Sequence, residues 1–198
     1  RQAYIKARPV AGDPEVRRAF IERVHRFVYE SEEQPDLAGR IQAMRHRMEV
    51  ERTGTGTTGA HVKLGSGGIV DIEFLVQYLQ LRHGRTHTAL RTPNTLEALR
   101  ALAAEGLLPT AEAIVLEESY RFLRRVENRL RIVADLSVNT LPAAPAKLEK
   151  LAKRMGYRPR PEAVARQQFL EDYSAHTLRV RAIYNRVFGP TDAGKPGG

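Results

Sequence analysis

The chain contains no cysteine, no apolar run long enough to span a bilayer, and no signal peptide at its start. The absence of cysteine from the 198 residues excludes disulfide bonds and thiolate metal sites, and it fits a reducing compartment. A membrane-spanning helix needs about 20 consecutive apolar residues, and no segment approaches that length. The sequence therefore predicts a soluble, cytoplasmic protein without a membrane partner.

Acidic residues are fewer than basic ones, with 23 Asp and Glu against 32 Lys and Arg and a net charge of +9. This excess raises nucleic acid or an acidic protein as a partner. The arginines are scattered along helical faces, without an aromatic-flanked basic stripe, zinc-finger spacing or RNA-recognition motif. The pattern disfavours nucleic acid and favours a solvated basic surface.

Apolar residues recur with helical spacing along nearly the whole chain. Caps at Asp13, Asp36 and Asn94, and stops at Gly106 and Gly156, mark helix ends. The predicted helices cover residues 14–30, 37–52, 69–82, 95–105, 110–134, 145–155 and 161–187. No strand ladder and no internal repeat is apparent in the sequence. We therefore predict an all-α fold, a bundle of about six or seven helices.

The predicted helices form a single domain over residues 1–189. It consists of an N-terminal helical pair at 1–52, a flexible Gly/Thr loop and Gly-rich turn at 53–66, and a main bundle at 67–189. The composition of residues 190–198 predicts a disordered tail.

The segment HVKLGSGGIVDIEFL, residues 61–75, joins a Gly-rich turn to a helix that is almost wholly apolar. Gly65, Gly67 and Gly68 allow backbone angles that other residues avoid. A helix N-terminus beside Lys63 can hold an anionic group, and Asp71 suits the first helical turn. These five residues are candidate interface or phosphate-proximal elements. The alternative is a purely structural turn, in which Gly67 and Gly68 allow a tight entry to the helix.

The spacing of Asp71 and Glu73 resembles that of the paired carboxylates of a two-metal site, but the resemblance is limited to the sequence. Two residues apart on a helix, their side chains diverge by about 160° and cannot chelate one metal. Glu73 shares a stripe with Gln77 and Gln80, so we expect it to be the more desolvated carboxylate of the two. A buried carboxylate needs a cationic partner.

Arg124 or Arg125 is the expected partner of Glu73 in a buried structural pair. On the same later helix, Glu127 is spaced to pair with Arg131 at four residues and with Arg124 at three. His83 and His87 lie four residues apart, but Gly84 interrupts the helix between them and disfavours zinc. The sequence therefore predicts no catalytic residue and no metal ligand within this chain.

Several blocks together carry a family resemblance: KLGSGGIVDIEFLVQYLQLRHG, LRTPNTLEALRALAAEGLL, YRFLRRVENRLRI, NTLP and LAKRMGY. In this order they resemble the helical domain of the glutamine synthetase adenylyltransferase family. The opening RQAYIKARPVAGDPE and the segment MRHRMEVER are similar to the stretch that follows a nucleotidyltransferase fold in that family. The same helical module is shared with the uridylyltransferases that modify the PII signal protein.

The resemblance implies a large enzyme with two similar halves. One half transfers AMP from ATP to a tyrosine of glutamine synthetase, and the other removes it by phosphorolysis. ATP and magnesium serve the full-length enzyme, and none is expected on this segment alone. The implied partners are glutamine synthetase, the PII signal protein and the chain's own upstream nucleotidyltransferase domain. The family's catalytic Gly-Ser turn and Asp-x-Asp lie upstream of Arg1, so no catalytic residue is carried over.

Two questions stay open at this point. GGIVDIEFLVQYL looks more like the C-terminal, adenylylating half, whereas FLRRVENRLR looks as much like the N-terminal, deadenylylating half. In either half, this segment would support the nucleotidyltransferase fold and contact the protein substrate. The alternative from another class is a freestanding helical adaptor that binds an acidic protein or nucleic acid.

Overall fold

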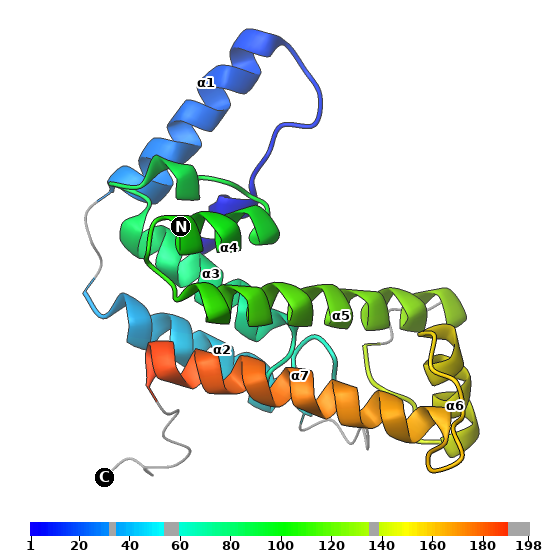
Figure 1. Ribbon diagram of the computed structural model, residues 1–198. Coiled ribbons are helices and arrows are strands. Elements are labelled where there is room, and N and C mark those ends of the chain that lie inside the picture. Colours follow the sequence, from blue (N-terminus) through cyan, green and yellow to red (C-terminus); the bar gives the residue numbers. More distant parts are fainter. Residues whose placement is uncertain (32–34, 54–59, 135–138, 190–198) are drawn as a thin grey trace. The chain divides into compact units, whose positions relative to one another are not determined.

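The computed structural model describes residues 1–31, 35–53, 60–134 and 139–189 (Figure 1). Within these ranges the chain forms seven α-helices and no strand, which confirms the all-α prediction. The helices are α1 (Pro14–His25), α2 (Leu37–Thr53), α3 (Ile69–His83), α4 (Thr95–Ala104), α5 (Thr110–Ala134), α6 (Pro145–Arg154) and α7 (Ala165–Phe188). Short helical turns are η1 (Gln2–Lys6), η2 (Arg26–Glu30) and η3 (Thr88–Leu90). The predicted disordered tail, and residues 54–59 of the predicted flexible loop, lie outside the described residues.

Most helix ends lie where the capping signals placed them. The Asp13 carboxylate accepts hydrogen bonds from the backbone N–H groups of Glu15 and Val16, and Pro14 takes the first helical position. Asn94 caps α4 through the N–H groups of Leu96 and Glu97. These bonds satisfy N–H groups that have no partner within the helix.

The last helix begins later than the sequence predicted. It was expected from Pro161, but α7 starts at Ala165. Residues 160–163 form a tight turn instead, in which Arg160 and Ala163 exchange backbone hydrogen bonds of 2.9 and 3.3 Å. The turn uses backbone groups that a first helical turn would have needed.

The chain gathers into two compact units. Unit 1 contains residues 1–41 and 73–117, and unit 2 contains residues 42–72 and 118–198. The unit boundaries fall within α2, α3 and α5. The single-domain division expected from the sequence stays a prediction.

Unit 1 contains η1, α1, η2, η3, α4 and most of α3. Its buried apolar residues include Val28, Leu75, Leu90, Leu99 and Leu102. Helix α1 is mostly exposed, and Figure 1 shows it projecting from the other helices of its unit. The π-helical turn η2 continues α1 to Glu30, the end that the sequence predicted.

Unit 2 contains most of α2, the turn at 60–68, the first residues of α3, the larger part of α5, and α6 and α7. Helices α5 and α7 run side by side (Figure 1), and the rings of Phe122 and His176 stack between them at 4.4 Å. Helix α6 packs against α7. This unit holds the Gly-rich turn and Asp71.

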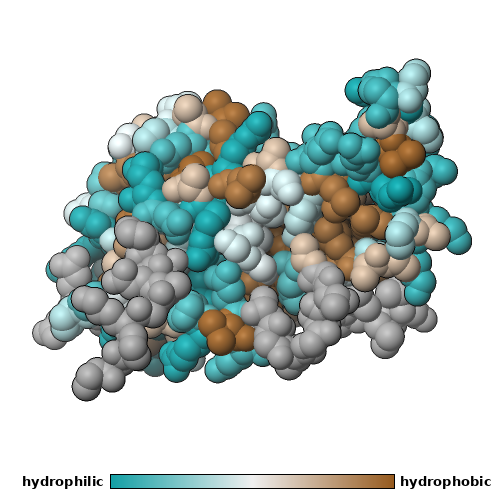
Figure 2. Space-filling view, turned by 90° about the horizontal axis from the view of Figure 1, so that it is seen from below, coloured by the Kyte–Doolittle hydropathy of each residue, from teal (hydrophilic) through white to brown (hydrophobic). Residues whose placement is uncertain are grey.

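The surface mixes hydrophobic and hydrophilic residues. On the face seen in Figure 2, hydrophobic patches are interrupted by hydrophilic residues. Among the described residues, no helix combines the length and hydrophobicity that crossing a membrane requires.

Candidate functional site

The Gly-rich turn is held by its own backbone. Gly65 N–H donates to the His61 carbonyl at 2.7 Å, and Gly68 N–H donates to the Gly65 carbonyl at 2.9 Å. The first helical N–H groups of α3, from Ile69 and Val70, donate back to Val62 and Lys63. These N–H groups are therefore already occupied within the turn and do not point at an open anion site.

Gly67 lies where no larger residue fits. Its φ of +70° is left-handed, and an added Cβ would lie 1.9 Å from the carbonyl oxygen of Thr177 on α7. An added Cβ at Gly68 would lie 2.8 Å from three carbonyl oxygens of the turn. Gly67 thus allows the turn to approach α7 closely, and Gly68 allows the turn to close on itself. This is the structural role given above as the alternative.

Asp71 is the centre of a buried charge cluster in unit 2. Its side chain is 0% exposed, and it accepts from three donors. Arg45 Nε donates to Oδ1, while Gly67 N–H and Arg181 Nη1 donate to Oδ2 at 2.7 and 3.1 Å. Two of these donors are guanidinium groups, so both carboxylate oxygens of Asp71 are held by charge-assisted hydrogen bonds.

Arg45 ties α2 to the turn. Its side chain is 1% exposed, and Nη2 donates to the carbonyls of Leu64 and Gly65 at 2.9 and 3.0 Å. Nη1 lies 3.3 Å from Glu49 Oε2, an ion pair without hydrogen-bond geometry. Arg181 on α7 lies 3.4 Å from the same carboxylate. Two arginines and two carboxylates thus alternate between α2, α3 and α7.

Tyr184 completes this cluster. Its ring is fully buried beneath the Arg181 guanidinium, 5.2 Å from the ring centroid. Burial, followed by the nearby charge of Asp71, raises the pKa of Tyr184 to about 12. The phenol therefore stays neutral over the physiological pH range.

The structure reverses the expected burial of the two carboxylates. Asp71 is fully buried, whereas Glu73 is partly exposed. Within unit 1, the charge of Glu73 acts on Lys6 and raises its pKa, although burial of Lys6 has the larger, opposite effect. The pairing of Glu73 with Arg124 or Arg125 stays a prediction.

Glu127 forms the predicted pairs along α5. Its carboxylate is 0% exposed and lies 2.7 Å from Arg124 Nη1 and 2.8 Å from Arg131 Nη2. Arg125 lies apart from this pairing and lines a hollow on the same unit.

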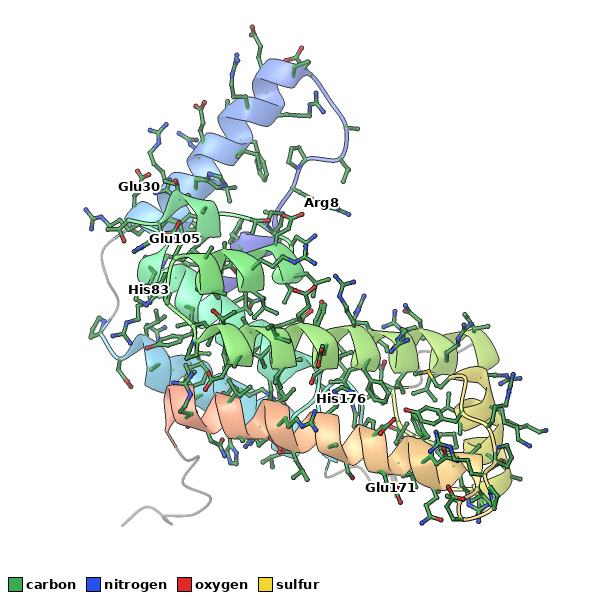
Figure 3. All side chains as sticks on the ribbon, in the orientation of Figure 1. Arg8, Glu30, His83, Glu105, Glu171 and His176 are labelled. Atoms are coloured by element: carbon green, nitrogen blue, oxygen red, sulfur yellow. The ribbon has the colours of Figure 1, made fainter. Side chains whose placement is uncertain are left out.

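His83 and His87 belong to unit 1, at the end of α3. Their rings meet edge to face at 6.2 Å, and His87 Nε2 lies 3.8 Å from Glu105 Oε2. Figure 3 labels His83 and Glu105 in this part of the molecule. Within the described ranges, no three His, Cys, Asp or Glu side chains are grouped to hold a metal ion.

Sequence reasoning missed Arg45, Glu49, Arg181 and Tyr184. A signal existed for Arg45, because it follows Ile41 by four residues and therefore lies on the buried side of α2. An arginine at such a position needs a carboxylate partner. Nothing in the sequence tells which carboxylate supplies it, because Asp71 lies 26 residues away in the chain.

Comparison with known proteins gives consistent matches. Residues 36–188 match the model of the family described as GlnD PII-uridylyltransferase. The chain is 36% identical over 187 residues to the bifunctional glutamine synthetase adenylyltransferase/adenylyl-removing enzyme of Streptomyces coelicolor, covering 94% of this chain and 18% of the relative. It is 41% identical over 159 residues to the enzyme of that name from Xanthobacter autotrophicus, covering 79% of this chain and 16% of the relative.

The chain thus spans less than a fifth of the length of these relatives. The resemblance read from the sequence is confirmed, since the relatives carry the name of the adenylyltransferase and the matching family is that of the PII uridylyltransferases. The family model covers all of the described residues of α2 to α7, including the Asp71 cluster. The chain belongs to the GlnD PII-uridylyltransferase family.

Proposed function

We propose that this chain is a helical, non-catalytic part of a glutamine synthetase adenylyltransferase. Such an enzyme transfers AMP from ATP to a tyrosine of glutamine synthetase, and its other half removes the AMP by phosphorolysis. The observation that carries the proposal is the identity to such enzymes over 94% of this chain but only 18% of the relative's length. The chain then supplies one helical segment of a much longer polypeptide.

The chemistry of Asp71 supports a structural role for this segment. A catalytic carboxylate that binds magnesium must offer its oxygens to the metal. The Asp71 oxygens instead accept from Arg45, Arg181 and the Gly67 N–H. In the proposal, ATP and magnesium bind the upstream nucleotidyltransferase domain in the cytoplasm, and this segment supports that domain.

The partners in this proposal are the upstream nucleotidyltransferase domain, glutamine synthetase and the PII signal protein. Two features support a contact with protein: the net charge of +9 and a cluster that fixes α2, α3 and α7 through charged side chains. A rigid segment presents its surface to a partner at little entropic cost.

The deadenylylating half of the same enzyme is the second candidate. It is favoured by the names of the relatives, which describe bifunctional adenylyltransferase/adenylyl-removing enzymes. The two candidates differ in the direction of AMP transfer and not in the structural role of this segment.

The test is AMP transfer from labelled ATP to glutamine synthetase with magnesium. It compares this chain alone with the chain extended upstream through the predicted nucleotidyltransferase fold. We expect activity in the extended protein only. Activity in the isolated chain would contradict the non-catalytic assignment. Phosphate-dependent release of AMP from adenylylated glutamine synthetase, measured on the same two proteins, identifies the deadenylylating half.

A further inference from the structure

The excess of positive over negative charge belongs to one of the two units. Unit 2 contains 20 Lys and Arg against 11 Asp and Glu, whereas unit 1 contains 12 of each. The whole excess of nine positive charges therefore belongs to unit 2. A surface of this sign attracts acidic partners, more strongly at low ionic strength.

Two adjoining hollows lie on unit 2, both lined by residues that follow α6 and by the first half of α7, and the smaller one also by the middle of α5. Their volumes are about 300 and about 370 Å³. Gly156, Tyr157 and Asp172 line both hollows, so one wall is shared. In that wall the Tyr157 hydroxyl donates to Asp172 Oδ2 at 2.5 Å.

Three arginines at these hollows form no ion pair among the described residues. Arg125 lines the smaller hollow, and Arg158 and Arg160 line the larger one. Other arginines of the same unit, such as Arg45 and Arg181, are paired with carboxylates. The hollows therefore present guanidinium groups that are available to an external carboxylate.

The smaller hollow also has an aromatic side. Phe122 and His176 line it and stack on each other at 4.4 Å, and Ser119 Oγ lies 2.9 Å from His176 Nδ1. Burial lowers the pKa of His176, which favours the neutral ring at neutral pH. Figure 3 labels His176 and Glu171 on this stretch of α7. A neutral aromatic wall beside guanidinium groups that pair with no carboxylate of the described residues suits an apolar side chain flanked by acidic residues.

The carboxylates at the hollows favour an acidic protein over a nucleic acid as the partner. Asp172 lines both hollows and Glu171 lines the larger one. A nucleic acid backbone carries phosphates for the arginines but no N–H donor for these two carboxylates. A peptide offers carboxylates to the arginines and its own N–H groups to Glu171 and Asp172.

We propose that these two hollows are a docking site for an acidic peptide segment of a partner protein, with an apolar side chain placed against Phe122 and His176. The arginines at 125, 158 and 160 bind its carboxylates. This site is separate from the Asp71 cluster, and it does not depend on the enzyme function proposed above.

The test measures binding to the 198-residue chain by fluorescence anisotropy at low ionic strength. The probe is a short fluorescein-labelled peptide of Asp and Glu around a central leucine. Its counterpart with Asn and Gln is the neutral control. We compare Arg125→Glu/Arg158→Glu with Arg47→Glu/Arg129→Glu, which reverses two exposed arginines elsewhere on unit 2 and changes the net charge equally.

We expect saturable binding that the Arg125→Glu/Arg158→Glu variant weakens by roughly tenfold or more, with a much smaller effect of the control variant. The imidazole NMR signals of His176 shift on binding, while those of the exposed His46 stay unchanged. Equal weakening by both variants, no binding at low ionic strength, or tighter binding of an oligonucleotide of equal charge would each overturn the proposal. None of these outcomes requires glutamine synthetase, so they are independent of the function proposed above.

Discussion

Gly67 and Gly106 have nearly the same backbone angle but very different surroundings. Their φ values are +70° and +68°, yet an added Cβ at Gly67 meets the Thr177 backbone at 1.9 Å, while nothing lies within 4 Å at Gly106. A left-handed φ costs a non-glycine residue roughly 1–2 kcal/mol. We expect Gly106→Ala to lower the free energy of unfolding by that amount only, and Gly67→Ala by about 3 kcal/mol or more.

Urea unfolding followed by circular dichroism measures both glycine variants. Gly106→Ala serves as the control, because it shares the backbone strain without the steric contact. Equal losses in the two variants would mean that the turn does not approach α7 as closely as described here.

The partners of the two carboxylates, Asp71 and Glu73, could not be predicted from the sequence. A helical wheel correctly separates Asp71 from Glu73 onto different faces, but it does not tell what covers each face. Arg45 and Arg181 reach Asp71 from positions 26 and 110 residues away in the chain. The ranking of the two carboxylates by desolvation was therefore wrong. The intrahelical pairs of Glu127 were predictable, because both partners lie within four residues on one helix.

At the scale of the element, α4 and α6 begin with opposite capping chemistry. Asn94 caps α4 with its side chain, whereas Ala144 occupies the same position before α6 with a similar extended backbone and no side-chain cap. Loss of an Asn cap costs about 1 kcal/mol. We expect Asn94→Ala to lower the free energy of unfolding by about that amount, and Ala144→Asn to raise it by a smaller amount.

Thermal unfolding of both cap variants provides the measurement. Opposite shifts in the melting temperature agree with the caps described here. A shift of the same sign in both variants would contradict the capping geometry at one of the two helices.

Helix boundaries followed the sequence where local chemistry determines them. Asp13, Asn94, Gly106 and Gly156 act within one turn of their own position, and the structure agrees with the sequence at each. The start of α7 was missed, because Pro161 also suits the turn that residues 160–163 adopt. Local signals thus predict most helix ends. Whether residues such as 160–163 form a separate turn or the first turn of a helix depends on contacts with residues far away in the sequence.

At the scale of the whole molecule, buried phenols make the fold sensitive to alkali. Burial is the largest cause that raises the pKa values of Tyr29, Tyr173 and Tyr184 to about 12. The unfolded value is about 10. The folded state therefore holds these protons more tightly, so their contribution to stability is present below pH 10 and is lost as the pH rises toward 12.

A spectrophotometric titration of the phenolate absorbance, with circular dichroism in parallel, checks this prediction. We expect the buried tyrosines to ionise only as helical signal is lost, whereas protein in concentrated urea titrates in one step. Ionisation of all seven tyrosines in one step, with the helical signal intact, would contradict the described burial.

Asp71, the buried carboxylate that follows the Gly-rich turn, serves structure and not metal chemistry. The most direct measurement uses the complete enzyme with Asp71→Asn, and Glu73→Gln as the control. It determines the melting temperature and the magnesium concentration that gives half-maximal AMP transfer. Breaking a buried ion pair costs roughly 3–5 kcal/mol. We therefore predict a clearly lower melting temperature for Asp71→Asn, with the magnesium dependence of the remaining activity unchanged. A magnesium requirement that rises several-fold while the melting temperature stays the same would show that Asp71 acts on the metal and not in the fold.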